Sequence, residues 1–168
     1  MSETITETDP DLILIDELAD FTKHSLMIVE ESRRELLILS KTLDPALYNN
    51  DDFYHRLLNM ARADRESHVK IMVKDFHSLE AHGHQILDLS RRLPSKIEIR
   101  HLKVRPSQDE IAFIIGDHKH LLFMHEDGVY NGAVNYDAED ECNELVREFN
   151  QLWKKHCDRD PAVNSMLI

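Results

Sequence analysis

The chain has 168 residues, enough for one domain with a substantial hydrophobic core. Its composition, 42% hydrophobic and 31% charged with only 4 glycines, is typical of a globular protein and excludes a low-complexity or disordered chain. The net charge of −12 makes nonspecific binding to nucleic acid or to an anionic membrane unfavourable, because both are polyanions.

The cysteines and the apolar segments predict a cytoplasmic protein. Cys142 and Cys157 are too far apart along one predicted helix to bond to each other, so both are expected to be reduced thiols. The acidic start lacks the basic and apolar regions of a signal peptide, and no apolar run approaches the roughly 20 residues of a membrane span. We therefore expect no contact with a membrane.

The first half of the chain predicts alternating helices and strands. Residues 1–11 are polar and acidic and are expected to form a disordered tail before a single domain over residues 12–168. Apolar residues at spacings of three and four predict an extra N-terminal helix over residues 12–32. The elements expected after it are a strand at 35–40, a turn at 42–50, a helix at 51–64, a strand at 69–73, a helix at 78–93 and a strand at 96–102.

The second half predicts a meander and a closing helix. Turn dipeptides separate three short strand candidates, at 111–115, 120–125 and 129–135, and an amphipathic helix is expected over 138–156. The apolar end of the tail, residues 166–168, is expected to dock on the core. Alternating strands and helices imply a parallel sheet, and the meander adds antiparallel strands. The fold class is therefore α/β, with a mixed β-sheet flanked by helices.

This order of elements resembles one repeat of the phospholipase D superfamily over about residues 32–156. The segments that carry the resemblance are SRRELLILSKTLDP, FYHRLLNMARADRESHVKIMVKD, LSRRLPSKIEIRHL and YDAEDECNELVREFNQLWKKH. The resemblance implies a single phospholipase D-like domain. The whole chain also resembles a bacterial family whose members end in a Trp-containing helix, an Asp-Pro and a short apolar tail.

Active members of the superfamily carry His-x-Lys-x-x-x-x-Asp, in which the His attacks phosphorus and the Lys holds the phosphate. In a first register, Asp117 takes the Asp position, Glu110 replaces the His and Ala112 replaces the Lys. We favour this register because Asp117, His118 and Lys119 then form the turn that follows the motif strand. Either alignment of the motif implies a degenerate catalytic site.

In a second register, Gly132–Asn135 matches the Gly-Ser-x-Asn segment that often follows the motif. His118 then takes the nucleophile position, His120 replaces the Lys and His125 replaces the Asp. Removing members of a cooperative catalytic set costs orders of magnitude in rate, so this register also weakens the case for catalysis.

The resemblance supports two main hypotheses of function. The leading one is a non-catalytic binding or interaction module, homodimeric because single-motif chains of the superfamily pair to complete a site. The alternative is a divergent phosphodiesterase with His118 as nucleophile, His120 as phosphate contact and His125 as the third member. A third hypothesis is a domain that binds a protein partner such as a separate enzyme. No cofactor is expected, and nucleic acid is an improbable partner at this net charge.

The end of the strand at 69–73 provides a further candidate. Ligands of open α/β sheets bind beyond the carboxyl ends of the strands, where we expect Asp75, Ser40 and Lys41 to lie together. The alternative is that Asp75 is a cap or loop residue. The ligand-binding candidates are Asp75, Asp117 and His118.

The histidines near residue 120 carry a weaker signal for a metal. His118 and His120 would share one face of a strand, and with His125 or Glu126 they could hold zinc. The sequence contains 11 histidines, so chance pairs are common and surface histidines are the preferred interpretation. We therefore expect no metal site.

Overall fold

The computed structural model describes residues 10–104 and 110–163. The strands in these residues are β1 (Leu12–Ile15), β2 (Glu35–Ser40), β3 (His68–Val73), β4 (Ile97–Leu102), β5 (Ala112–Gly116), β6 (His120–Met124), β7 (Gly132–Asn135) and β8 (Cys157–Arg159). The helices are α1 (Leu18–Glu31), α2 (Pro45–Tyr48), α3 (Asp51–Arg62), α4 (Phe76–His82), α5 (Gln85–Arg92) and α6 (Glu139–Lys155).

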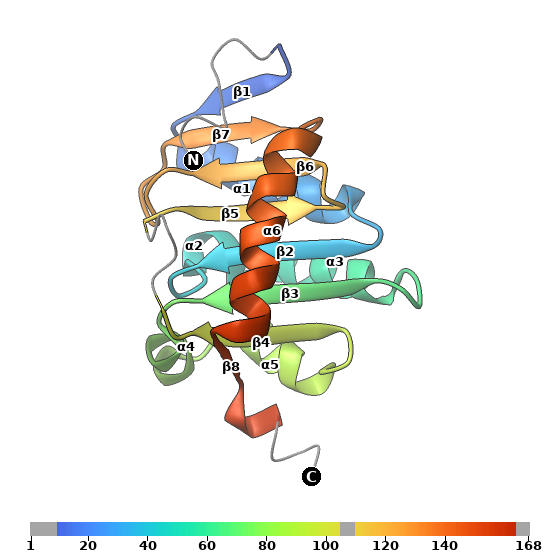
Figure 1. The fold of residues 1–168 in the computed structure, drawn as a ribbon, viewed down its shortest axis with the longest axis vertical. Helices are drawn as coiled ribbons and strands as arrows, with labels where there is room; N and C mark the ends of the chain where they lie inside the picture. The colour runs from blue at the N-terminus through green and yellow to red at the C-terminus, as the bar shows by residue number, and fades with distance from the viewer. Residues whose placement is uncertain (1–9, 105–109, 164–168) are drawn as a thin grey trace.

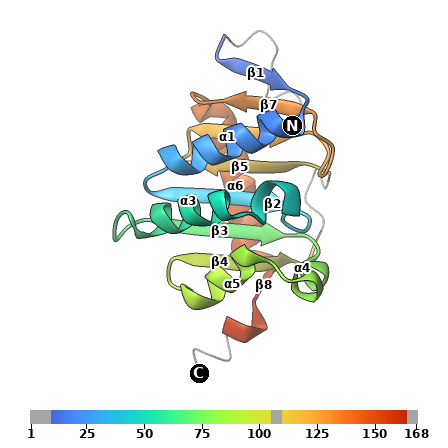
Figure 2. The same cartoon turned by 180° about the vertical axis from the view of Figure 1, so that it is seen from behind.

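These strands form one sheet with the order β1-β7-β6-β5-β2-β3-β4-β8. The long helix α6 crosses one face of the sheet, and α1 to α5 lie on the other face (Figures 1 and 2). The fold is thus α/β with a mixed sheet flanked by helices, as the sequence predicts. In the described part of the chain, no helix is long and apolar enough to cross a membrane.

The centre of the sheet is buried on both faces. Successive side chains of a strand point to opposite faces. In β2, Leu36 and Ile38 therefore pack in the core beneath α1 to α5. Leu37 and Leu39 pack in the core beneath α6. This double coverage explains why β2 is a continuous apolar run rather than an alternating one.

The three strands β2, β3 and β4 run parallel, and α3 and the α4–α5 pair form the crossovers between them. Their carboxyl ends, at Ser40, Val73 and Leu102, consequently meet at one edge of the sheet. Strand β5 runs antiparallel to β2 and begins at that same edge. The meander β5–β6–β7 extends the sheet on one side, where β1 pairs antiparallel with β7, and β8 closes the other side against β4.

Most predicted elements are confirmed, but the helix expected over residues 12–32 is wrong in its first part. Leu12–Ile15 is the strand β1, and the helix begins only at Leu18. The apolar run fits a strand as well as a helix, and backbone pairing with β7, more than a hundred residues later, decides between them. From Leu18 onward the N-terminal helix covers a sheet face, where it packs against β5, β6 and α3.

The single helix expected over residues 78–93 is also wrong, because two helices replace it. Gly83 ends α4 with a φ of 75°, a conformation that favours glycine. The ring of His84 then caps α5 by accepting the N–H of Ile86 at 3.1 Å, while its other nitrogen lies 3.0 Å from the carbonyl of Leu43.

The remaining expectations concern the turn at 42–50 and the two ends of the chain. The predicted turn at 42–50 contains the one-turn helix α2, which the side chain of Asp44 caps. Residues 10–11 form a turn. The rest of the predicted disordered tail, residues 1–9, and the apolar end at 166–168 lie outside the described residues.

Candidate functional site

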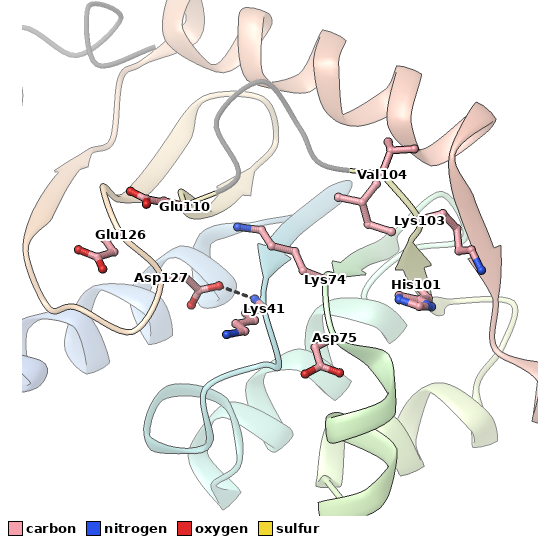
Figure 3. Close-up of a pocket in the computed structure, with 10 residues that line it drawn as sticks. Lys41, Lys74, Asp75, His101, Lys103, Val104, Glu110, Glu126 and Asp127 are labelled. Carbon is pink, nitrogen blue, oxygen red and sulfur yellow. Dashed lines mark hydrogen bonds between the residues drawn. The ribbon is translucent and has the colours of Figure 1, made fainter.

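A cavity of about 600 Å³ opens at the carboxyl edge of the parallel strands. Loops leave this edge in different directions because β2, β3 and β4 end there while β5 begins there. The residues lining the cavity are Lys41, Lys74, Asp75, His101, Leu102, Lys103, Val104, Glu110, Glu126 and Asp127, and we call it the edge cleft (Figure 3).

Main-chain hydrogen bonds hold the ends of β2 and β3 side by side beneath the edge cleft. The N–H of Lys74 donates to the carbonyl of Ser40 at 3.0 Å, and the N–H of Asp75 donates to the carbonyl of Lys41 at 2.8 Å. The parallel ladder thus continues beyond the last residues of both strands. The expectation that Ser40, Lys41 and Asp75 lie together at this edge is confirmed.

Asp75 is both a cleft residue and a helix cap. Its carboxylate accepts the N–H of Ser78 at 3.1 Å and the hydroxyl of the same residue at 2.8 Å. The hydrogen bonds from Ser78 lower the pKa of Asp75. The carboxylate is therefore held in the ionised form and directed toward the start of α4.

Two contacts join the loops on either side of the edge cleft. The carboxylate of Asp127, in the β6–β7 connection, accepts the N–H of Lys41 (Figure 3). The ammonium of Lys74 donates to the carbonyl of Ile111, just before β5, at 2.7 Å. Burial raises the pKa of Asp127, although the bond from Lys41 acts in the opposite direction. These contacts link the parallel strands to the meander across the cleft.

The charges of the edge cleft are mixed. Its lining contains three lysines and four carboxylates, so it is close to neutral and differs from the strongly basic grooves that bind nucleic acid. Lys103 forms an ion pair with Asp158 at 3.1 Å. Glu110 and Glu126, both exposed, lie toward β5 and β6, whereas His101 and Lys103 lie at the end of β4 (Figure 3).

Three residues that line the edge cleft, His101, Lys74 and Asp127, were not predicted from the sequence as candidates. His101 and Lys103 are two residues apart at the end of β4, and both line the edge cleft. The ring of His101 stacks against Phe76 with 6.3 Å between the ring centres. A signal existed, because Lys74 directly follows β3 and His101 is the penultimate residue of β4, so both lie at the carboxyl ends of strands. No local signal placed Asp127, which lies in a turn.

Asp117 and His118 lie at the opposite edge of the sheet, in the β5–β6 turn. Both have a left-handed backbone, with φ of 52° and 56°. The carboxylate of Asp117 accepts three main-chain N–H groups at the start of β2, from Arg33 at 2.9 Å, Arg34 at 2.8 Å and Glu35 at 3.1 Å. Asp117 and His118 are therefore separated from Asp75 by the length of the strands, and the three candidates do not form one site.

His118 is instead part of a small cluster around Glu35. One carboxylate oxygen of Glu35 bonds the ring of His118, and the other lies 2.5 Å from the ring of His68. Burial acts to raise the pKa of Glu35, but the bonds from His118 and His68 outweigh it and lower the pKa. The cluster connects the β5–β6 turn to the starts of β2 and β3.

The structure does not bring the three histidines of the second register together. His118 precedes β6 and His125 follows it, so the whole strand separates them. His120 contacts the carbonyl of Tyr136 at 3.1 Å and does not line the edge cleft. His118 and His120 do not share a strand face, because His118 is in the turn. In the described ranges, no three His, Cys, Asp or Glu residues are grouped as metal ligands.

In the first register, the structure places the substituted positions beside the edge cleft. Glu110 lines the cleft, and Ala112 begins β5, where it is 5% exposed and pairs with Met124. Asp117, the third position of this register, directly follows β5 and lies in the β5–β6 turn. Neither Glu110 nor Ala112 supplies the imidazole or the cationic side chain of the motif.

A family model described as a domain of unknown function (DUF7931) matches residues 17–166. A search of curated proteins found no match. The chain is similar in structure to TrmBL2, an archaeal chromatin protein that binds DNA, with a TM-score of 0.67 and 18% identity over 95% of this chain. The chain spans only 59% of that protein's length.

Two further solved structures are similar. NucT from Helicobacter pylori has a TM-score of 0.61 and 13% identity, over 89% of this chain and 97% of NucT. Phosphatidylserine synthase from Haemophilus influenzae has a TM-score of 0.58 and 10% identity, over 89% of this chain and 38% of the synthase. Both have phospholipase D-like folds. Identities this low establish a shared fold and leave the activity open.

Proposed function

Because the chain belongs to the DUF7931 family and has a phospholipase D-like scaffold, we propose that it is a non-catalytic binding module whose ligand site is the edge cleft. The observation that carries this proposal is the pair of residues at the substituted motif positions. Glu110 stands where the nucleophilic His would be, and the buried methyl group of Ala112, at the Lys position, cannot hold the phosphate during a reaction. The cleft is thus suited to binding a ligand but lacks the motif residues that hydrolyse a phosphodiester.

The ligand that the edge cleft suits best is a small polar molecule with an anionic group. Lys41, Lys74 and His101 come from the ends of three adjacent strands and line the cleft, with the two lysines on the side of β2 and β3 and His101 at the end of β4 (Figure 3). The neighbouring carboxylates of Asp75 and Asp127 already accept hydrogen bonds from Ser78 and Lys41. An ammonium group carries three donors, so Lys74 can contact an anion in addition to its bond to the carbonyl of Ile111.

Nucleic acid fits this cleft poorly, although TrmBL2 binds DNA. Affinity for nucleic acid comes largely from neutralising several phosphates with Lys and Arg, and here the chain carries a net charge of −12. The lining of the cleft, with three lysines and four carboxylates, also provides too little positive charge to neutralise several phosphates. A small ligand needs only one local cationic contact.

The geometry does not favour the alternative of a phosphodiesterase with His118 as nucleophile. The ring of His118 bonds Glu35 at the edge opposite the cleft, and no lysine is bonded to this cluster among the interactions described. A general base or nucleophile must lie within hydrogen-bond reach of a bound substrate.

We also propose that the chain is a homodimer, as the resemblance to single-motif members of the superfamily implies. Light scattering of the purified chain provides the test. A mass of twice 19.7 kDa would support the dimer, and a mass of one chain across the accessible concentration range would contradict it.

The binding proposal is tested by titrating glycerol 3-phosphate into the ¹⁵N-labelled protein and following the amide signals. We expect shifts near Lys41, Lys74 and His101, lost in Lys74→Met and retained in Lys119→Met, which removes an exposed lysine at the opposite edge. Shifts equal in both variants, or none in the wild type, would contradict the proposal.

A parallel assay tests the absence of catalysis. A chromogenic phosphodiester is incubated, with and without zinc, with the wild type, His118→Ala and His101→Ala. No turnover is expected. Turnover that disappears in either histidine variant would identify the nucleophile and replace the binding proposal with an enzymatic one.

A further inference from the structure

Strand β1 presents an open apolar edge of the sheet. It pairs with β7 on one side, and in residues 10–104 and 110–163 no strand pairs with its other side (Figure 1). Five large hydrophobic side chains are exposed in these residues, and three of them, Ile13, Leu14 and Leu18, lie in β1 or directly after it. Leu14, at 61% exposed, is the most accessible of the five. The apolar exposure of the molecule is thus concentrated at this edge.

The other outermost strand of the sheet, β8, is protected against strand addition. Strand β8 has only three residues, and its side chains are paired, Asp158 with Lys103 at 3.1 Å and Arg159 with Glu98 at 3.4 Å. Short length and charged side chains are the usual means of preventing another strand from adding to a sheet. Strand β1 has neither charge nor a proline within Leu12–Ile15.

The side chains of β1 would contact an added strand on both faces of the sheet. Ile13 and Leu14 are successive residues and point to opposite faces. Ile15, on the same face as Ile13, is buried in the core beneath α1. An added strand would therefore extend an existing hydrophobic layer with Ile13 and would cover Leu14 on the other face.

The charges beside β1 determine which partner fits. Asp11 precedes the strand, and Asp16 and Glu17 follow it, all of them exposed. In an antiparallel pair of two β1 strands centred between Ile13 and Leu14, Asp11 of each copy would face Asp16 of the other. Like charges directly opposite destabilise strand pairing. A second copy of this chain is therefore disfavoured on β1 in this register, which pairs all four apolar residues of both strands.

We propose that the outer edge of β1 binds an extended apolar segment of another protein, flanked by Lys or Arg residues, by strand addition. Main-chain hydrogen bonds along Leu12–Ile15 provide the affinity, and ion pairs with Asp16 and Glu17 select the partner. This surface is distinct from the edge cleft, which lies at the ends of other strands, so the inference is independent of the proposed ligand site.

The test measures binding of a fluorescein-labelled peptide, KRVTVTRK, by fluorescence anisotropy, with EDVTVTDE as the acidic counterpart. We expect the basic peptide to bind and to protect from hydrogen exchange the β1 amides that point away from β7. Reversing the charges with Asp16→Lys and Glu17→Lys should weaken the basic peptide about fivefold and favour the acidic one. Glu30→Lys with Glu31→Lys, at the far end of α1, is the matched control and should leave the preference unchanged.

A second variant tests the role of the backbone. Leu14→Pro removes a main-chain N–H group of β1 and interrupts strand pairing there, so it should abolish binding of both peptides. Equal binding of the two peptides, protection of amides elsewhere than β1, or no binding at all would overturn the proposal. Self-association of the free chain that Leu14→Pro abolishes would also overturn it, in favour of a second copy as the occupant.

Discussion

The carboxylate of Asp117 accepts the main-chain N–H of Arg34 at 2.8 Å, across 83 residues of sequence. The same carboxylate also accepts the N–H groups of Arg33 and Glu35. One turn residue therefore fixes the start of the central strand β2 relative to the β5–β6 hairpin. In this fold the residue at the Asp position of the first register has a structural role at the edge opposite the cleft.

Replacing Asp117 should destabilise the protein. Asp117→Ala removes three charge-assisted hydrogen bonds. It also places an alanine at a φ of 52°, a left-handed conformation that Asp and Asn adopt more readily than Ala does. We expect a loss of about 2 kcal/mol in the free energy of unfolding, measured by urea denaturation. Asp117→Asn keeps one acceptor oxygen and tolerates the left-handed backbone, so it should lose clearly less. An equal loss in both variants would show that the hydrogen bonds contribute little.

The Glu35 cluster predicts a specific dependence of stability on pH. The pKa of Glu35 is lower in the folded protein than its ordinary value of 4.5. Its stabilising contribution is therefore complete above about pH 4.5 and is lost as the pH falls through the folded pKa. Urea denaturation of wild type and Glu35→Gln between about pH 6 and 3 should show a steeper loss in the wild type. Parallel curves would contradict this role of Glu35.

An ion pair holds the C-terminal segment to α5. Arg91 donates to both carboxylate oxygens of Asp160, at 2.8 and 3.1 Å, and Asp160 is only 3% exposed. Arg91→Met should cost about 3 kcal/mol of unfolding free energy, because it leaves a buried carboxylate unpaired. The double variant Arg91→Met with Asp160→Leu should recover part of that loss. Glu80→Gln is the control, since the Glu80 side chain is 51% exposed and should cost less than about 1 kcal/mol.

Gly132 is required at the start of β7. A β-carbon there would lie 1.9 Å from the carbonyl oxygen of Phe123 on the neighbouring strand, closer than any real contact. Gly132→Ala should therefore force β6 and β7 apart and cost about 3 kcal/mol of unfolding free energy, measured by thermal or chemical denaturation. Ala133→Gly, one residue later in the same strand, is the control for strand propensity. A cost in Gly132→Ala no larger than in this control would contradict the close approach.

The two thiols should react slowly in the native protein. Burial raises the pKa of Cys142 to about 12 and that of Cys157 to about 11, so the reactive thiolate is scarce at neutral pH. With a chromogenic disulfide reagent at about pH 8, Cys142 should remain unmodified and the half-buried Cys157 should react slowly. The same reagent should count two thiols at once in denaturant. Rapid modification of Cys142 in the native state would contradict its burial.

Sequence patterns were sufficient where an element depends on its own residues. The continuous apolar run of β2 and the alternation of β3 and β4 predicted those strands correctly, since length and hydrophobic period are local properties. Helix α6 was predicted within one or two residues of its bounds, Glu139–Lys155, because its apolar stripe and acidic first turn are contained in it. The placement of Asp75 at a strand end was correct for the same reason.

Only the tertiary structure decided the elements and sites that depend on distant partners. Leu12–Ile15 became a strand through pairing with β7, and Asp117 acquired its role through amides at the start of β2. The edge cleft unites His101, Lys74 and Asp127 because parallel strands end at one edge whatever their separation in sequence. The sequence alone determined the α/β class and most strand positions, since hydrophobic periodicity is read locally. Strand order and the convergence of side chains are set by long-range hydrogen bonding and packing, which leave no local pattern.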